Sequence, residues 1–315
     1  MSESQLIVET AERIFADHCP PEVVQGAEEG RYPSALETTL VESGLNGIGL
    51  PDSGTAWPEL FEVLRVAGRY AAPLPLYERL IAQALLGREA AGLGLGVWQD
   101  GRVSVAWPEQ HEQVLLVDAA AERGAIVATG ALDLQPGHSI AGEPLATGSA
   151  AAPDELAVTG VGDILALGRV AQMCGALERV LELAIGYTSE REQFGRTLSK
   201  FQAIQHSLAV LAAEVAAAQR ATDAAIAGCD PLPRWTDVAV AKVRVGEAAG
   251  VCAESAHQAH GAMGFTQEHR LHHFTRRLWA WRDDAGAEGE WAARLGAEIV
   301  ANGADNLWSF VTSHA

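Results

Sequence analysis

A stripe of apolar residues in the C-terminal half limits most strongly how this chain can fold. In the segment FQAIQHSLAVLAAEV the apolar residues are spaced three or four positions apart: Phe201, Ile204, Leu208, Leu211 and Val215. This spacing places them on one side of an α-helix and is typical of helices that pack at a shallow angle in a bundle. A second long helix is expected from about residue 236 to residue 260. The sequence therefore predicts a C-terminal helical bundle over residues 161–315.

The remaining sequence divides into a helical part and a β-rich part. Residues 4 to about 90 show helical patterns broken by Pro and Gly. Between about residues 94 and 160, the short runs RVSVAW, EQVLLVDA and GAIVATGAL are typical of strands. A chain of 315 residues is long enough for several such units. We therefore expect an N-terminal helical domain over residues 1–92 and a truncated β domain over residues 93–160.

Three local signals add detail to this division. Ser34 is a candidate N-cap, and Glu37 follows it at the spacing of a capping box. Asp163 is expected to be the N-cap of the first bundle helix. The stretch GEPLATGS, residues 142–149, follows the β-rich runs and is expected to be a loop.

Composition and charge exclude several functional classes. The formal net charge of −19 argues against a nucleic-acid partner, because phosphate binding needs a cationic face. No apolar run reaches the roughly 18 residues of a membrane span, and the first residues resemble an amphipathic helix more than a signal peptide. The cysteines lack the spacing of a disulfide framework or zinc site; they are Cys19, Cys174, Cys229 and Cys252. We therefore expect a cytoplasmic protein with neither a nucleic-acid nor a membrane partner.

Two segments of the C-terminal half contain recognisable motifs. They are YTSEREQFGRTLSKFQAIQHSLA, residues 187–209, and HQAHGAMGFTQEHRLHHFTRR, residues 257–277. From the residues alone, the first is a helix interrupted at Gly195, and an ordinary corner between two helices remains an alternative. Together, the two segments closely resemble the signatures of the flavin-dependent acyl-CoA dehydrogenases. The resemblance implies a mainly α fold with a small β middle domain: an N-terminal helical domain, a reduced β domain and a C-terminal four-helix bundle.

The resemblance also implies a cofactor and a reaction. Family members remove the α-proton of an acyl-CoA thioester with a carboxylate while the β-hydrogen leaves as hydride to FAD, and an electron-transfer flavoprotein is the acceptor. They bind FAD across a subunit interface. The residues at the matching positions form two cofactor-facing groups: Arg191, Gln193, Phe194, Leu198 and Gln202 in the first, and Gln258, Gly261, Ala262 and Gly264 in the second. Arginine suits phosphate and small residues allow close backbone approach, although Ala262 replaces the usual second glycine.

The chain departs from the family in two places. The middle unit lacks the Thr-Glu-Pro-x-x-Gly-Ser and Trp-Ile-Thr stretches that contact the flavin ring in relatives, so the flavin-facing strands are expected to be deleted. The two positions that carry the catalytic glutamate in relatives are occupied here by Ala285 and Leu165, which cannot accept a proton. A shifted loop could bring Asp283, Asp284 or Glu288 into the site, and Asp284 is the candidate atypical base.

Other polar and aromatic residues have plainer interpretations. Glu178 and Glu182 are expected on a solvated or subunit face. No metal site is expected, because there is no HExxH motif or cysteine partner, and the clustered histidines are interpreted as interface or bundle-surface residues: His257, His260, His269, His272 and His273. The tryptophans near the end of this region are interpreted as core and interface anchors: Trp279, Trp281 and Trp291.

Three hypotheses of function follow. The first is a shortened subunit that pairs with a full-length acyl-CoA dehydrogenase in an α2β2 tetramer, as in steroid-degrading bacteria, and donates part of the FAD site while the partner holds the base. The second is a self-sufficient homo-oligomer that uses Asp284. The third is a structural subunit without turnover. The acyl group itself is not predicted.

Overall fold

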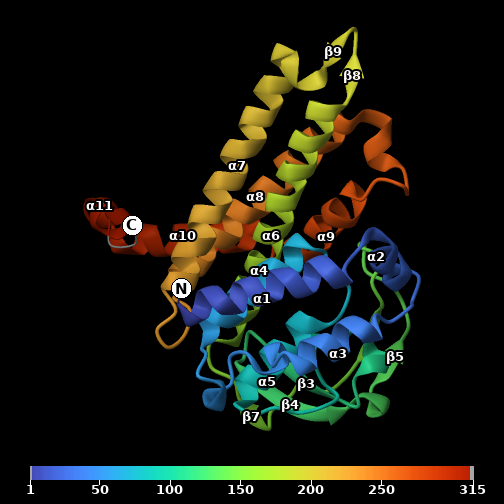
Figure 1. Cartoon of the computed structure of the whole chain (residues 1–315). Coiled ribbons are helices and arrows are strands. Elements are labelled where there is room, and N and C mark those ends of the chain that lie inside the picture. Colours follow the sequence, from blue (N-terminus) through green and yellow to red (C-terminus); the bar gives the residue numbers. More distant parts are fainter. Residues whose placement is uncertain (1, 313–315) are drawn as a thin grey trace.

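The computed structural model describes residues 2–312, and in it helices precede and follow a single main sheet (Figure 1). The α-helices within this range are α1 (Glu3–His18), α2 (Pro21–Glu28), α3 (Ser34–Glu42), α4 (Trp57–Arg69), α5 (Leu76–Leu86), α6 (Val161–Glu190), α7 (Gln202–Ala227), α8 (Trp235–His260), α9 (Leu271–Asp283), α10 (Glu288–Asn302) and α11 (Leu307–Thr312). The strands are β1 (Leu93–Gln99), β2 (Arg102–Ala106), β3 (Gln113–Asp118), β4 (Arg123–Ala128), β5 (Asp133–Gln135), β6 (Leu145–Ser149), β7 (Leu156–Ala157), β8 (Glu192–Gln193) and β9 (Arg196–Thr197). The predicted mainly α fold with a small β middle is confirmed. No helix in the described range is both long and apolar enough to cross a bilayer.

The main sheet has the strand order β5-β6-β2-β1-β3-β4-β7. Only β1 and β3 run parallel, while the other neighbouring strands are antiparallel. The prediction that residues 142–149 form a loop is wrong, because β6 (Leu145–Ser149) pairs with β2 on one side and β5 on the other. Backbone pairing with two neighbours outweighs the local turn preference of its flanking Gly and Pro.

Two predicted helix starts differ from the structure by a few residues. Helix α3 begins at Ser34 itself, with Pro33 at the N-cap position, so the capping role predicted for Ser34 is wrong. Helix α6 begins at Val161 after Gly160, whose φ of 69° lies in the left-handed region, so Asp163 is in the first turn and not at the cap. Its carboxylate instead lies 3.5 Å from the guanidinium of Arg294 on α10.

Two glycines allow α4 and α6 to cross with their backbones in contact. A Cβ atom on Gly175 would lie 1.9 Å from the carbonyl oxygen of Arg65, and a Cβ atom on Gly68 would lie 2.0 Å from the carbonyl oxygen of Gln172. No side chain fits into either space without moving a helix. This crossing joins the N-terminal helices to the C-terminal bundle.

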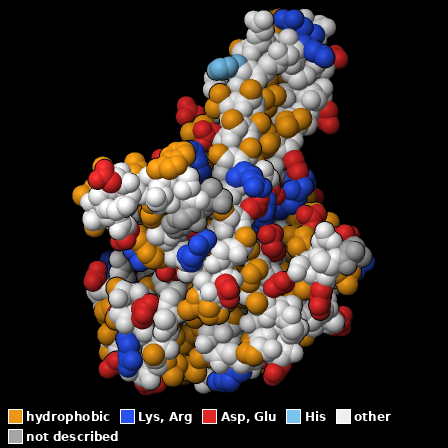
Figure 2. Space-filling model, turned by 90° about the vertical axis from the view of Figure 1, so that its left-hand side faces the viewer, with side chains coloured by type: hydrophobic (Ala, Val, Ile, Leu, Met, Phe, Trp, Pro, Cys, Tyr) orange, Lys and Arg blue, Asp and Glu red, His pale blue; other side chains and the backbone are white. Residues whose placement is uncertain are grey.

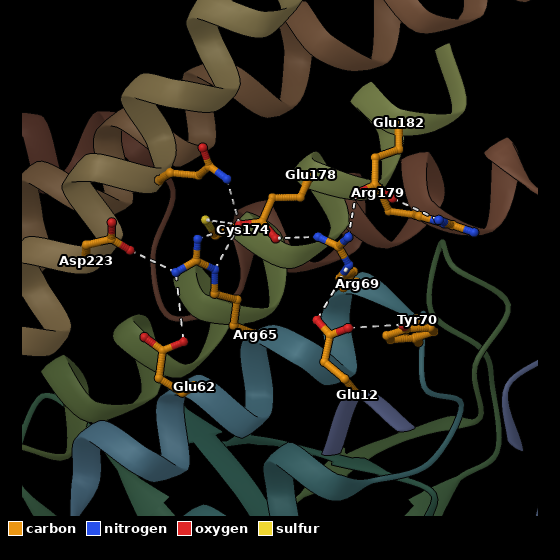
Figure 3. A network of polar contacts seen from close by, with 11 residues as sticks. Glu12, Glu62, Arg65, Arg69, Tyr70, Cys174, Glu178, Arg179, Glu182 and Asp223 are labelled. Atoms are coloured by element: carbon orange, nitrogen blue, oxygen red, sulfur yellow. Dashed lines mark hydrogen bonds and ion pairs between the residues drawn. The ribbon is translucent and has the colours of Figure 1, made fainter. Parts of the chain in front are cut away.

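Ion pairs surround the crossing (Figure 3). Arg65 donates to Glu178 on α6 at 2.9 Å through Nε and to Asp223 on α7 at 2.8 Å through Nη1. Arg69 donates to Glu178 at 3.2 Å and also to Glu182. The side chain of Glu178 is only 11% exposed, so the prediction of a solvated or subunit face is wrong for this residue, and Glu182 is also paired within the chain. The sequence pattern of α6 gave no sign of these partners, because they lie on α4.

A second buried network ties α9 to the N-terminal part. The side chain of Arg277 is fully buried and donates to Glu28 on α2 at 2.7 Å, while its Nη2 lies 3.1 Å from Glu143, just before β6. His273 bonds to Glu28 at 2.9 Å, and Arg276 pairs with the same carboxylate. Burial alone would raise the pKa of Glu28, but the His273 hydrogen bond and the Arg277 charge outweigh it and lower that pKa to about 2. Arg277 on α9 therefore links α2, through Glu28, to the segment before β6, through Glu143.

We predict that Gly175→Ala lowers the free energy of unfolding by about 3 kcal/mol, because the added methyl group must push α4 and α6 apart. The matched control is Gly186→Ala on the same helix, where a Cβ would meet nothing within 4 Å. That change should be neutral or stabilising by up to about 1 kcal/mol, since alanine favours the helix. Urea unfolding of both variants measures the difference, and equal stabilities would contradict the close crossing.

Candidate functional site

A two-residue β-hairpin connects the ends of α6 and α7. Strands β8 and β9 pair with the register Glu192↔Thr197 and Gln193↔Arg196. The turn residues Phe194 and Gly195 have φ values of 52° and 76°, as the tightest hairpin turns require. Glycine adopts this conformation readily, whereas a phenylalanine in it is strained and uncommon. The break predicted at Gly195 is confirmed, but the hairpin itself was not predicted.

This hairpin forms the end of an arm, defined here as residues 185–210, that extends away from the rest of the chain (Figure 1). Phe194 at the tip is 92% exposed. Arg191, Gln193 and Gln202 are also exposed, and Leu198 is half-buried. Figure 2 shows Lys and Arg side chains gathered at the end of the arm and apolar side chains along it. The first predicted cofactor group therefore lies on a projecting surface and not inside the bundle.

The pleat of the hairpin places most of this group on one face. The pairing extends to Arg191 and Leu198, because the Leu198 N–H donates to the Arg191 carbonyl oxygen at 2.9 Å. Side chains alternate between the two faces along each strand, and directly paired residues share a face. Arg191, Gln193 and Leu198 therefore share one face, and Glu192 lies on the other.

The second predicted group lies where α8 ends. Gln258 and Gly261 line an open cleft of about 550 Å³, together with Phe265, His257 and Trp279. Gly261 has a φ of 58°, so its backbone conformation favours glycine. The other two members of the group differ in their surroundings. Ala262 is exposed, whereas Gly264 is buried, with space for a Cβ only 3.0 Å from the Cβ of His260.

The two groups of predicted cofactor residues begin close together, at the ends of α6 and α8, but the tip of the arm extends further from the bundle. The ring of Tyr187, near the end of α6, stacks on His260 of α8 with centroids 4.5 Å apart. Arg191 follows Tyr187 by one helical turn, and from there the hairpin continues away from the bundle (Figure 1). The arm thus presents its predicted cofactor residues outward.

A cavity of about 940 Å³ lies at the other end of α6. Its walls come from α5, the main sheet, α6 and the connection between α9 and α10. Both positions expected to carry a catalytic carboxylate, Leu165 and Ala285, line this one cavity. The fold therefore brings together the two base positions predicted from the sequence, and neither holds an acid.

Two of the acids that the sequence analysis considered as replacements for the base are held by arginine. Asp284 accepts a hydrogen bond from Arg169 Nε at 2.9 Å, and Glu288 accepts one from Arg282 at the same distance. Glu288 does not line the cavity, whereas the exposed Asp283 does. Asp284, the candidate atypical base, is thus paired with a guanidinium inside its own chain.

The structure adds Glu78, which the sequence analysis missed. This buried carboxylate on α5 lines the same cavity and accepts a hydrogen bond from Arg169 Nη2 at 2.9 Å. Burial raises the pKa of Glu78, and the neighbouring Arg169 only partly offsets that effect. The guanidinium of Arg169 also lies 3.6 Å from the centre of the Tyr77 ring. No local pattern could identify Glu78, because its partner lies 91 residues away in the sequence.

The loop that carries Ala285 is held from three sides. Lys242 Nζ donates to the carbonyl oxygens of Arg282 and Asp284, each at 2.8 Å. Trp291 Nε1 donates to the Ala285 carbonyl oxygen at 2.9 Å, and Arg169 holds the Asp284 carboxylate. These bonds oppose the loop shift that would move Asp283 toward the base position.

The histidine cluster does not form a good metal site. Glu28, His272 and His273 place their ligand atoms within 4.8 Å of one another. Arg276 and Arg277 already bind the Glu28 carboxylate, so a cation there would face two guanidinium charges. The prediction of interface or surface histidines is wrong for His260 and His273, which are buried.

The tryptophans behave largely as anchors. Trp281 and Trp291 are buried in the core, as the sequence predicted. Trp279 is exposed and lines the cleft at the end of α8.

Comparison with known proteins identifies the family. The family model described as acyl-CoA dehydrogenase, C-terminal domain, matches residues 163–287. Acyl-CoA dehydrogenase IpdE2 of Mycolicibacterium smegmatis is 28% identical over 317 aligned residues, covering 94% of this chain and 99% of that protein. Residues 163–287 belong to the acyl-CoA dehydrogenase C-terminal domain family.

Solved acyl-CoA dehydrogenase structures share the fold over nearly the whole chain. A chain of the Tcur3481-Tcur3483 steroid ACAD G363A variant superimposes with a TM-score of 0.84 and 22% identity, covering 96% of this chain and 99% of the other. A chain of the ChsE4-ChsE5 complex from Mycobacterium tuberculosis gives a TM-score of 0.82 and 19% identity, covering 95% and 98%. The chain therefore has the fold of these solved chains, which it matches over nearly their whole length.

The residues of the arm and cleft fit a phosphate-bearing dinucleotide such as FAD. Arg191 and the amides of Gln193 and Gln202 offer hydrogen-bond donors, which suit phosphate and ribose oxygens. The N-terminus of α7 at Gln202 has no side-chain cap, so its first N–H groups are further donors. The cleft beside Gln258 and Gly261 has room for another part of such a molecule. The donor set therefore matches the cofactor that the family implies.

Proposed function

We propose that this chain is the shortened subunit of a heteromeric acyl-CoA dehydrogenase and pairs with a full-length subunit in an α2β2 tetramer. Its arm and cleft complete the FAD site of the partner, and the partner supplies the ring-facing part of that site and the catalytic base. The reaction is the α,β-dehydrogenation of an acyl-CoA thioester. A steroid or another bulky acyl group is the proposed substrate class, with electron-transfer flavoprotein as the electron acceptor and the cytoplasm as the location.

The observation that carries this proposal is the separation of the arm from the cavity. Leu165 lies in the cavity and Glu190 ends α6 just before the hairpin, 25 residues later (190 − 165) on one continuous helix. At 1.5 Å per residue the two points are about 38 Å apart. The cofactor residues of the arm therefore serve a ligand other than one in the chain's own cavity, and a neighbouring subunit is the natural holder of that ligand.

The chemistry of the cavity supports the same assignment. The reaction needs a carboxylate free to take the α-proton, and FAD, when bound, supplies the hydride acceptor. Leu165 and Ala285 have no acidic group, and Arg169 holds the Asp284 carboxylate at 2.9 Å. That carboxylate is therefore already engaged as a hydrogen-bond acceptor within its own chain. The partner is therefore the proposed source of the base.

Names of relatives support the heteromeric form and the substrate class. One structural neighbour is a complex of two named chains, ChsE4 and ChsE5, and another is named as a steroid acyl-CoA dehydrogenase of two components.

The self-sufficient homo-oligomer stays an alternative, and Glu78 now joins Asp284 as a base to test for it. A structural subunit without turnover is the third possibility, and the fate of FAD on changing Arg191 distinguishes it.

We predict that the chain purified alone binds little flavin, whereas co-production with a full-length acyl-CoA dehydrogenase from the same genome gives a yellow heterotetramer. In that complex Arg191→Ala should release FAD, because the loss of one charged phosphate contact weakens binding about 10- to 100-fold. Flavin absorbance per mole of complex, after gel filtration, measures both effects. Stoichiometric FAD on the chain alone would contradict the shared site, and full retention by the Arg191 variant would favour a purely structural role.

A second prediction concerns the base. In the assembled complex, Asp284→Asn and Glu78→Gln should each keep turnover within about threefold of the parent, since the base lies on the partner. Asp283→Asn, at the exposed acid that also lines the cavity, should keep turnover in the same range. Steady-state kcat is measured on samples with equal flavin content. A loss of about 100-fold or more with flavin retained, which is what removal of a general base causes, would place the base in this chain.

A further inference from the structure

Arg196 lies on the same face of the hairpin as the predicted cofactor residues, although the family motif does not single it out. It is the first residue of β9 and pairs directly with Gln193 across the hairpin. Directly paired residues project from the same face of a β-ribbon, and Arg191 lies two positions before Gln193. Two guanidinium groups, those of Arg191 and Arg196, are therefore carried by one face of the hairpin.

The position of the Arg196 side chain is fixed by an aromatic ring. Its guanidinium carbon lies 4.0 Å from the centre of the Phe201 ring, at the N-cap of α7. Phe201 in turn meets Phe194 edge to face, with centroids 6.3 Å apart. Stacking on a ring face holds a guanidinium in place while its N–H edges remain free to donate. The strained Phe194 turn thus belongs to the same cluster that orients Arg196.

The charges of both arginines are uncompensated within the chain. Between residues 2 and 312, neither Arg191 nor Arg196 forms an ion pair with a carboxylate, whereas most other arginines do. Two arginines without such a partner on one face of a short hairpin form a local positive patch. Neighbouring cations repel each other, and an anion placed between them relieves that repulsion. The site therefore favours a ligand with more than one negative charge.

We propose that Arg196 is a second phosphate-binding residue. Arg196 and Arg191 together bind the pyrophosphate of the FAD that the partner subunit holds. The inference rests on the proposed function, since the ligand belongs to the neighbouring chain. A pyrophosphate carries two negative charges on adjacent phosphates, and each arginine fork can bind one of them. In this role Arg196 acts in cofactor binding and not in the proton or hydride transfer.

The test measures FAD binding to the co-produced complex, stripped of flavin and titrated with FAD while protein and flavin fluorescence are followed. Arg196→Met keeps an apolar stem over Phe201 but removes the charge, and Arg191→Ala is the reference. The matched control is Glu192→Ala, on the opposite face of the same hairpin. We expect Arg196→Met to raise the FAD dissociation constant about 10- to 100-fold and to weaken its dependence on salt. Glu192→Ala should not raise it.

The outcomes separate this inference from the proposed function. If Arg191→Ala weakens FAD binding and Arg196→Met does not, the second phosphate contact is wrong and the shared site stands. If neither variant weakens binding, both are wrong. Arg196→Lys covers the case in which the methionine variant fails to assemble. It keeps one charge but loses the fork, so it should bind FAD more weakly than the parent, and parental affinity would overturn the bidentate contact.

Discussion

The backbone contact between α4 and α6 is the constraint on which the rest of the structure depends. Because Gly68 and Gly175 have no side chains there, the helices approach closely enough for arginines of α4 to bind carboxylates of α6. The chain then continues from α4 into α5, which brings Glu78 to Arg169 on α6. The same crossing therefore sets both the joint between the helical parts and the arrangement of charges in the cavity.

Helix α6 also separates the two sites that matter for function. Its first half lines a cavity in which both expected base positions, Leu165 and Ala285, lack an acid, and its end carries an arm with two exposed arginines, Arg191 and Arg196. The proposed assembly accounts for this separation, because a second subunit would supply the base and hold the cofactor that the arm binds. The Asp284 carboxylate, which could have served as a base, instead holds the loop through Arg169.

Local patterns in the sequence predicted much of the fold. The extent of α8 and the break at Gly195 follow from periodicity and glycine, which act over a few residues. The pairing of β6 and the contact between Glu78 and Arg169 could not be predicted in this way, because they depend on segments far apart in sequence. The hairpin conformation of Phe194 was also beyond prediction, since phenylalanine does not favour a positive φ. The two positions that lack a catalytic acid, Leu165 and Ala285, were found only by aligning the sequence motifs with those of the family.

The most direct test of the account is to locate the FAD on the two chains of the assembled complex. The flavin-free complex is reconstituted with an FAD analogue that carries a photoreactive azido group on its adenine, irradiated and digested, and the labelled peptides are mapped by mass spectrometry. The account predicts label on peptides of this chain within residues 191–202 or 258–264. Label found only on the partner chain would contradict the claim that this subunit completes the partner's cofactor site.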